Sequence, residues 1–352
     1  MKLNLRAPIG LQLGYGIVSW EIAQALHNLG TELIYHPIGQ PQVTQKEAPL
    51  VQKWINNREF YSSHSPTISI WHQHDLFTRI SREVNGALTF FEKDKLTNLE
   101  IESLNTQDFI VAPCEFIKNA IESDKRFKRE VKHITMGVDS DFFRPIEMPD
   151  NGRPYRFAVI GKLEKRKSHD IIHELFSRAF NKNDDVELFV SWDNPFLQED
   201  EKKYWEKLYK ESTLGDKIEF IPRMGREQLP QLYNMVDCVL CLSRAEGLDL
   251  VAMEAMSCGK PLIVTNYSAH TDYCTLENSL LVDIDETEPA YDGHWFDGMC
   301  GSWAKMGDRQ EEQIIDYMRK CYKTRYNNNI QGRQDMLGRA WSKTAEKILE
   351  CY

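Results

Sequence analysis

The stretch EGLDLVAMEAMSCGKPLIV, residues 246–264, decides the fold of this chain. It reads as a loop with a free backbone at Gly247, a helix of about two turns over 250–257, a break and a strand. Gly259 followed by Pro261 ends the helix, as a glycine and then a proline usually do at a helix C-terminus. The N–H groups at the start of such a helix have no partner within it, so they point toward an anion in front of it. The sequence therefore predicts an anion site where this helix begins.

Two glutamates and a basic loop accompany the predicted anion site. Glu246 precedes the helix, and Glu254 stands about two turns into it. Taken singly, the first reads as a helix N-terminal cap and the second as a surface helix residue. Upstream, the loop GKLEKRK at 161–167 follows the strand-like run 157–160. By itself this loop reads as a solvated basic turn.

Length and composition indicate a globular protein of two domains. The 352 residues suffice for two domains of ordinary size. The 41% hydrophobic and 27% charged fractions are those of a soluble globular chain. No apolar run approaches the roughly 20 residues of a membrane span. The start, MKLNLRAPIG, lacks the apolar segment of a signal peptide, so we expect a cytoplasmic protein.

The net charge of −10 argues against a broad nucleic-acid surface. The basic segment Lys118–Lys132 is a local exception. It is either a solvated helix end and loop or a contact for an anionic acceptor or membrane surface. The eight cysteines are scattered and are expected to be reduced. Cys238 and Cys241 stand three apart on a predicted strand, so they face opposite sides, which argues against a metal or redox pair.

Strand-like runs alternate with amphipathic helical stretches along the whole chain, which predicts α/β units with parallel sheets. A linker is expected at 146–154, where Pro, Gly and Asn occur without periodicity. A final helix is expected at about 335–350. The other expected elements are strands at 67–71, 87–91, 109–112, 186–191, 218–221 and 237–242 and helices at 17–29 and 168–180.

The segments 246–264 and 161–167 together resemble signatures of the retaining nucleotide-sugar glycosyltransferases of family 4 (group 1). That family has the GT-B fold, in which two Rossmann-like domains with parallel sheets face each other across a cleft. The resemblance implies an acceptor-side domain, residues 1–148 with the returning helix at about 335–352, and a donor-binding domain, residues 149–334. This chain departs from the family's common EGFGL at Asp249, which replaces the second glycine.

On the donor side, the resemblance assigns Lys162 and Lys167 to the diphosphate of the donor. Fixed cations and a helix start can stabilise the charge of the departing phosphate without a metal. Glu254 is expected to accept bonds from the ribose hydroxyls, and Glu246 to bond the donor sugar near the reacting carbon. The remaining donor-binding positions that the resemblance implies are Gly247, Leu248, Asp249 and Leu250 in the loop, and Arg223 and Met224 for the base.

The resemblance places a second group of residues in the N-terminal domain. The loop with Gly14 and Gly16 resembles the family's N-terminal glycine loop, which reaches the donor phosphates and the acceptor; alternatively it is only a tight turn. Tyr15 in this loop and Glu92 after a strand are expected on the acceptor side, although Glu92 also reads as a solvated strand end.

His72 and His74 follow another strand of that domain. The resemblance assigns them to the cleft, where one bonds the donor sugar or orients the acceptor hydroxyl. They also read as packing residues, and as a metal pair they lack further ligands nearby. The aromatic segment 288–307 reads either as a lid or as an aromatic surface for a sugar.

The implied function is transfer of a sugar from a nucleoside diphosphate, UDP or GDP, to an acceptor hydroxyl with retention of configuration. A saccharide or glycolipid is the expected acceptor, with a nucleic-acid base hydroxyl as the other option. No cofactor or metal is expected. Front-face attack is favoured over a covalent intermediate, since no nucleophile on the opposite face is evident. The alternatives are a nucleotide-sugar epimerase on the same fold and a non-catalytic sugar- or nucleotide-binding protein.

Overall fold

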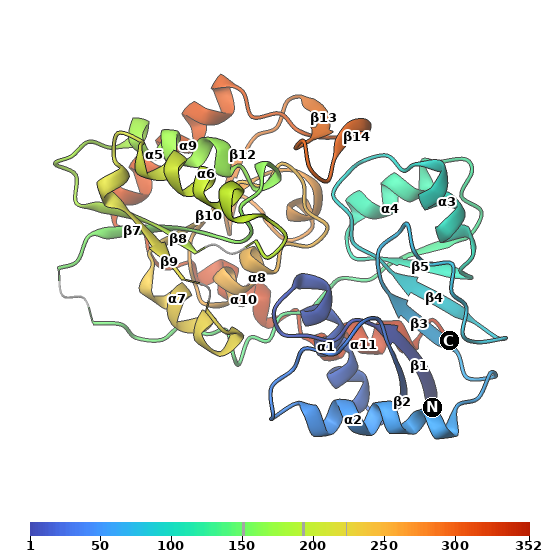
Figure 1. Ribbon diagram of the computed structural model, residues 1–352. Helices are drawn as coiled ribbons and strands as arrows, with labels where there is room; N and C mark the ends of the chain where they lie inside the picture. The colour runs from blue at the N-terminus through green and yellow to red at the C-terminus, as the bar shows by residue number, and fades with distance from the viewer. Residues whose placement is uncertain (150–151, 192–193, 223) are drawn as a thin grey trace. The chain divides into compact units, whose positions relative to one another are not determined.

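A computed structural model of the protein describes residues 1–149, 152–191, 194–222 and 224–352. The chain forms two compact units, Met1–Gly137 with Arg339–Tyr352 (unit 1) and Val138–Gly338 (unit 2). Each unit is built on a six-stranded parallel sheet with helices packed on it (Figure 1). The predicted α/β class with parallel sheets is confirmed.

Unit 1 has the strand order β2-β1-β3-β4-β5-β6. The chain therefore moves from β1 to β2 in one direction and then returns to place β3 on the other side of β1. The last helix, α11, packs against α1 in this unit (Figure 1). The elements are β1 (Lys2–Ala7), α1 (Gly14–Asn28), β2 (Glu32–Pro37), α2 (Ala48–Asn56), β3 (Thr67–Ile70), β4 (Asn85–Leu88), α3 (Asn98–Asn105), β5 (Phe109–Ala112), α4 (Glu115–Glu122), β6 (Glu130–His133) and α11 (Trp341–Leu349).

Unit 2 repeats this plan with the order β12-β11-β10-β7-β8-β9, so its reversal lies between β7 and β10. Helices α5, α6 and α9 cover one face of the sheet and α7, α8 and α10 the other (Figure 1). The elements are β7 (Tyr155–Ile160), α5 (His169–Ala179), β8 (Val186–Ser191), α6 (Glu199–Lys210), β9 (Ile218–Ile221), α7 (Leu229–Met235), β10 (Cys238–Cys241), α8 (Leu250–Ser257), β11 (Leu262–Thr265), β12 (Leu280–Val282), the antiparallel pair β13 (Thr287–Tyr291) and β14 (Asp297–Ala304), α9 (Asp308–Thr324) and α10 (Ile330–Leu337).

The order reversals matter for function because ligands of parallel α/β sheets bind outside the carboxyl ends of the strands at such points. Unit 2 has its reversal between the strands that lead into the 161–167 loop and the 246–264 stretch. The sheet topology thus brings these two segments, about 80 residues apart in sequence, to the same edge.

Two predicted elements differ from the structure. The single helix expected at about 335–350 is wrong: α10 and α11 are separate, and Gly338, a poor helix residue, follows the first. The strand expected at 87–91 ends earlier, at Leu88 in β4, because the Phe90 backbone N–H and C=O bond the Tyr15 hydroxyl instead of a neighbouring strand. Residues 150–151 of the predicted linker lie outside the described residues.

His169, the first residue of α5, is fully buried in unit 2. Its Nδ1 lies 2.7 Å from the Tyr209 hydroxyl. Burial, with a smaller contribution from Lys167, lowers the pKa of His169 to about 3. The imidazole is therefore neutral in the folded protein at neutral pH.

We expect the substitution His169→Asn to reduce the fall in the free energy of unfolding as the pH is lowered from 7 to 4. Between about pH 6.5 and 3 the unfolded histidine binds a proton that the folded one does not, so stability falls by about 1.4 kcal/mol per pH unit on acidification. Asparagine can keep the bond to Tyr209 but cannot be protonated. Urea unfolding from pH 4 to 7 measures both slopes, and equal slopes would contradict the assignment.

Candidate active site

Two loops meet at the carboxyl ends of β7 and β10. The first, residues 161–168, leads from β7 to α5, and the second, residues 242–249, leads from β10 to α8. The backbone N–H of Arg244 donates to the Arg166 carbonyl over 2.7 Å and joins them. The side chain of Arg244 forms a bidentate ion pair with Asp170 on α5, with N–O distances of 2.7 and 2.9 Å. The loops are therefore held in register by a buried arginine that the sequence analysis missed.

The predicted residues Lys167 and Glu246 come together at this junction. The Lys167 Nζ lies 2.7 Å from the Glu246 Oε1, and the Arg166 Nη1 lies 2.8 Å from the same oxygen. The side chains of Lys167, Glu246 and Arg166 are only 14%, 7% and 6% exposed, respectively. Gly161 makes room for this arrangement: its φ is +138°, and a Cβ there would lie 3.1 Å from the Lys167 Cδ.

The charges of this cluster are fixed by one another. Burial opposes ionisation of Glu246, but Arg166 and Lys167 outweigh it and hold the pKa of Glu246 well below its usual range. In turn, burial of Lys167 is outweighed by Glu246 and Asp249, which raise the pKa of Lys167 above its ordinary value. Both side chains are therefore charged at neutral pH, and Glu246 has no proton to give as a general acid.

Asp249, where the resembled family has glycine, occupies the left-handed region with φ 62° and ψ 77°. Glycine adopts this conformation freely, and aspartate is among the few other residues that tolerate it. Its carboxylate does not cap α8. Instead, Oδ2 lies 2.9 Å from the His270 Nε2 and Oδ1 lies 3.8 Å from the Lys167 Nζ. The departure from the family pattern thus keeps the backbone shape and adds a buried carboxylate beside the cluster.

Substitution of Asp249 should separate the contribution of its left-handed backbone from that of its buried carboxylate to the stability of the protein. Asp249→Ala removes the buried partner of Lys167 and His270 and keeps a Cβ in the left-handed region, so we expect a loss of about 3–5 kcal/mol of stability. Asp249→Gly loses the same charge without the conformational cost and should be about 1 kcal/mol more stable than the alanine variant. Urea unfolding at pH 7 measures both, with Asp249→Asn as the control that tolerates this φ. Equal stabilities for glycine and alanine would show that the backbone plays no part.

Glu254 on α8 is buried, so it is not the surface helix residue that the isolated sequence suggests. Its Oε2 accepts a hydrogen bond of 2.8 Å from the Tyr233 hydroxyl, and its Oε1 lies 3.4 Å from the Arg226 Nη1. The Arg226 guanidinium lies over the ring of Phe143 at 5.3 Å. Sequence reasoning missed Tyr233 and Arg226. Arg226 is close in sequence to the predicted base-binding pair, of which Met224 is described and Arg223 lies outside the described residues.

Lys162 does not join the Lys167 cluster. Its Nζ lies 2.8 Å from the Glu164 Oε1 and 5.6 Å from the centre of the Phe196 ring. The Glu164 Oε2 also accepts a hydrogen bond of 2.9 Å from the Arg166 Nη2. The cation that accompanies Lys167 at Glu246 is therefore Arg166, which the sequence analysis did not single out. The loop has four cations, Lys162, Lys165, Arg166 and Lys167, and no periodicity distinguishes the two that reach Glu246.

The remaining loop positions that were predicted for the donor lie between Glu246 and the start of α8. The Leu248 carbonyl accepts a bond of 2.7 Å from the Tyr273 hydroxyl, and Gly247 precedes it. Leu250 is the first residue of α8. On the other side, the Ser268 hydroxyl accepts from the Glu246 N–H at 2.8 Å. The loop is thus anchored from the β11–β12 connection on both sides of Gly247.

The acceptor-side residues gather at the order reversal of unit 1. Tyr15 at the start of α1 packs its ring 4.4 Å from His72, after β3, and His72 stacks on His74 at 5.3 Å. Burial raises the pKa of Tyr15, and Glu92 adds a smaller upward contribution. The Tyr15 hydroxyl donates to the Phe90 carbonyl over 2.8 Å. The four predicted residues of this group therefore share one edge of the sheet.

The two glycines of the N-terminal loop differ in what they permit. A Cβ on Gly16 would lie 3.0 Å from the Gly10 backbone, so this glycine is required for close packing of the loop. Gly14 has open space around it. The packing of Gly16 agrees with the tight-turn interpretation, and contact with a donor or acceptor stays a prediction for both.

Several cations of the Lys118–Lys132 segment already face carboxylates. Lys118 lies 3.6 Å from Glu115 and Lys132 lies 3.5 Å from Glu130. Arg126 pairs with Asp124. The predicted contact with an anionic surface stays a prediction. Within the described ranges, no three His, Cys, Asp or Glu side chains lie close enough to hold a metal ion, and no helix is long and apolar enough to cross a membrane.

Comparison with known families gives one match within unit 2. Residues 143–287 match the family described as Glycosyl transferases group 1. Two curated relatives are mannosylfructose-phosphate synthase of Agrobacterium fabrum, 26% identical over 57% of this chain, and D-inositol 3-phosphate glycosyltransferase of Mycobacteroides abscessus, 23% identical over 61%. The aligned residues span 47% and 44% of those proteins, so less than half of each is represented here.

Solved structures show the same fold along the whole chain. Sucrose-phosphate synthase from Thermosynechococcus elongatus aligns with a TM-score of 0.72 and 14% identity, covering 100% of this chain and 98% of the other. Anabaena Alr3699/HepE in complex with UDP and glucose aligns with a TM-score of 0.68 and 15% identity, covering 100% and 99%. The predicted GT-B architecture is confirmed.

Proposed function

We propose that the chain, whose residues 143–287 match the glycosyl transferases of group 1, moves a sugar from a nucleoside diphosphate sugar to an acceptor hydroxyl with retention of anomeric configuration. The observation that carries the proposal is the buried cluster of Lys167, Arg166 and Glu246 at the order reversal of unit 2. Such a reversal is where the sheet admits a ligand, and the cluster supplies both signs of charge there.

The donor diphosphate would lie against Lys167 and the start of α8. The first N–H groups of that helix lack intrahelical partners, and the Asp249 side chain does not cap them. A diphosphate brought to this point competes with Glu246 for Lys167. Arg166, held by Glu164 and Glu246, would fix the geometry of the loop. Lys167 and the helix start would then stabilise the negative charge that grows on the departing phosphate.

Glu246 would then accept a hydrogen bond from a hydroxyl of the donor sugar. It is ionised at neutral pH, because its pKa lies well below the usual range under the influence of Arg166 and Lys167. A fixed negative charge beside the reacting carbon favours the positive charge that develops there during transfer. Glu254, oriented by Tyr233, would accept from the ribose hydroxyls of the nucleotide.

Retention is proposed to proceed on the front face of the sugar. An oxygen of the leaving phosphate would take the acceptor proton as the acceptor oxygen attacks from the same side. The alternative, a covalent intermediate, requires a nucleophile on the opposite face. Tyr15, His72 and Glu92 of unit 1 are proposed to contact the acceptor, with His72 or its neighbour His74 orienting the hydroxyl.

A donor and acceptor screen tests the proposal. The likeness to a structure that holds UDP and glucose makes UDP-sugars the first donors to try, with GDP-sugars beside them. We expect release of nucleoside diphosphate only with an acceptor hydroxyl present, and an anomeric proton coupling in the product that matches the donor. A changed sugar still joined to its nucleotide, formed without acceptor, would indicate an epimerase. Saturable donor binding without any turnover would indicate a binding protein.

A further inference from the structure

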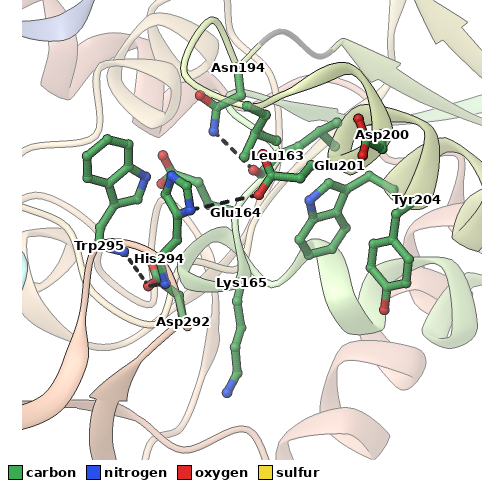
Figure 2. Close-up of a pocket in the computed structure, with 12 residues that line it drawn as sticks. Leu163, Glu164, Lys165, Asn194, Asp200, Glu201, Tyr204, Asp292, His294 and Trp295 are labelled. Carbon is green, nitrogen blue, oxygen red and sulfur yellow. Dashed lines mark hydrogen bonds and ion pairs between the residues drawn. The ribbon is translucent and has the colours of Figure 1, made fainter.

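Unit 2 contains a cavity of about 370 Å³ that the proposed donor site does not use. Its walls come from the loops after β7 and β8, the start of α6 and the turn of the β13–β14 hairpin (Figure 2). The volume lies within the range of about 300–1,000 Å³ typical of small-molecule sites. Lys167, Glu246 and Asp249 do not line it. The turn of the hairpin, residues 292–296, lies beyond the segment that matches the family.

Aromatic side chains stand on opposite walls of the cavity. Trp295 projects from the hairpin and Tyr204 from α6 (Figure 2). The ring centre of Trp205 lies 5.8 Å from that of Tyr204. Trp295 and Tyr204 are 57% and 61% exposed. Trp295 is nevertheless held in place, because its ring contacts His294 at 4.6 Å and Phe196 at 5.8 Å edge to face. Large exposed rings that are fixed around a hollow are typical of a ligand-binding surface.

The polar lining consists largely of hydrogen-bond acceptors. The lining includes four carboxylate residues, Glu164, Asp200, Glu201 and Asp292, and ionised carboxylates only accept hydrogen bonds. A ligand that complements them must therefore donate several hydrogen bonds. An anionic ligand such as a phosphate would be repelled, since among the described residues of the lining only Lys165 and His294 are basic, against four carboxylates.

Among the carboxylates of the lining, Glu164 is compensated by cations. Glu164 pairs with Lys162 at 2.8 Å and Arg166 at 2.9 Å. Asp292 accepts from three consecutive backbone N–H groups, those of 294–296, at 2.8–2.9 Å. Glu201 lies 3.8 Å from the His294 ring. The remaining lone pairs of these carboxylates can accept hydrogen bonds from the hydroxyl groups of a neutral ligand, and a cationic ligand is the alternative that the binding experiment tests.

We propose that this cavity is a binding site for neutral saccharide, separate from the donor nucleotide site. A pyranose ring would lay an apolar face on Trp295 or Tyr204 and donate its hydroxyls to the Glu164, Glu201 and Asp292 carboxylates. This assignment favours the aromatic-surface interpretation of the 288–307 segment. It does not depend on the proposed transfer reaction, because a saccharide can bind here whether or not unit 2 also binds a donor.

Binding of neutral oligosaccharides by the full chain tests the proposal. Maltohexaose, cellohexaose and mannotriose are titrated while tryptophan fluorescence and calorimetric heat are recorded, with choline and UDP as comparison ligands. We expect saturable binding of at least one saccharide. Trp295→Ala should weaken that binding by about tenfold or more, through loss of a large stacked surface. UDP binding should stay within about twofold of the unsubstituted protein, since Trp295 is outside the proposed donor site.

Met299→Ala provides the matched control, because Met299 is on the same hairpin, is 86% exposed and does not line the cavity. It should leave saccharide binding unchanged, and equal melting temperatures would show that the Trp295 variant is folded. No saccharide binding up to about 20 mM, far weaker than a dedicated site, would overturn the proposal. Trp295-dependent binding of choline but of no saccharide would also overturn it, in favour of a cation site. Saccharide binding by the unsubstituted protein without any sugar transfer would count against the proposed function alone.

Discussion

Replacement of Lys167 by methionine is expected to lower the rate of sugar transfer by about 10²–10³-fold. Methionine has a similar length but no charge, so the departing diphosphate loses its buried cation. That cation acts most strongly in the transition state, when negative charge grows on the leaving phosphate, so kcat should fall more than the KM for the donor rises. Steady-state kinetics with the best donor and acceptor measure both parameters.

Lys207→Met is the control for loss of a lysine charge on unit 2. Lys207 is 68% exposed on α6 and pairs only loosely with Glu211 at 3.7 Å, so its replacement should leave transfer unchanged. Lys167→Arg should recover part of the lost rate, because the charge is kept in a different shape. A Lys167→Met variant that melts like the original protein and transfers sugar at the original rate would exclude the proposed role of this side chain.

The donor-side loops could be predicted from the sequence because their signals are local. The helix predicted at 250–257 and the strands at 186–191 and 218–221 agree with α8, β8 and β9. Their boundaries are set by glycine, proline and short apolar runs within a few residues. The pairing of the Lys167 loop with the Glu246 loop was predicted through the family resemblance, and the sheet order gives it a physical reason.

The partners that orient the site could not be predicted, since they come from distant segments. Arg244 reads in sequence as one more polar residue before Glu246, yet it ties the loop to α5 through Asp170. Tyr233, on α7, and Arg226, in the turn before it, reach Glu254 from segments 21 and 28 residues away in the sequence. Whether a basic residue faces inward is decided by the backbone of its turn, so the contact of Arg166 with Glu246 could not be predicted, while the contact of Lys162 with a diphosphate stays a prediction.

Glu246→Gln is expected to separate donor binding from transfer. Glutamine keeps the size of the side chain and an oxygen that can accept from Lys167, but it removes the negative charge between Lys167 and Arg166. The site becomes more positive, so we expect UDP to bind as tightly as before or more tightly. Transfer should fall by about 10²-fold or more, because the charge beside the reacting carbon is lost. Calorimetric titration with UDP and transfer kinetics measure the two effects.

The pH dependence of the Glu246→Gln rate and the reaction of azide with a Glu246→Ala variant show whether Glu246 acts as a fixed charge, a general acid or a nucleophile. The pKa of Glu246 is well below its usual range, so the ratio of original to variant rates should be the same at pH 6 and pH 8. A general acid at this position would instead make the ratio fall as pH rises, since the original enzyme would lose its proton. A nucleophile would be revealed by azide, which would enter the space left in Glu246→Ala and give a glycosyl azide of inverted configuration. Front-face transfer predicts no such product, because the face opposite the diphosphate is never attacked.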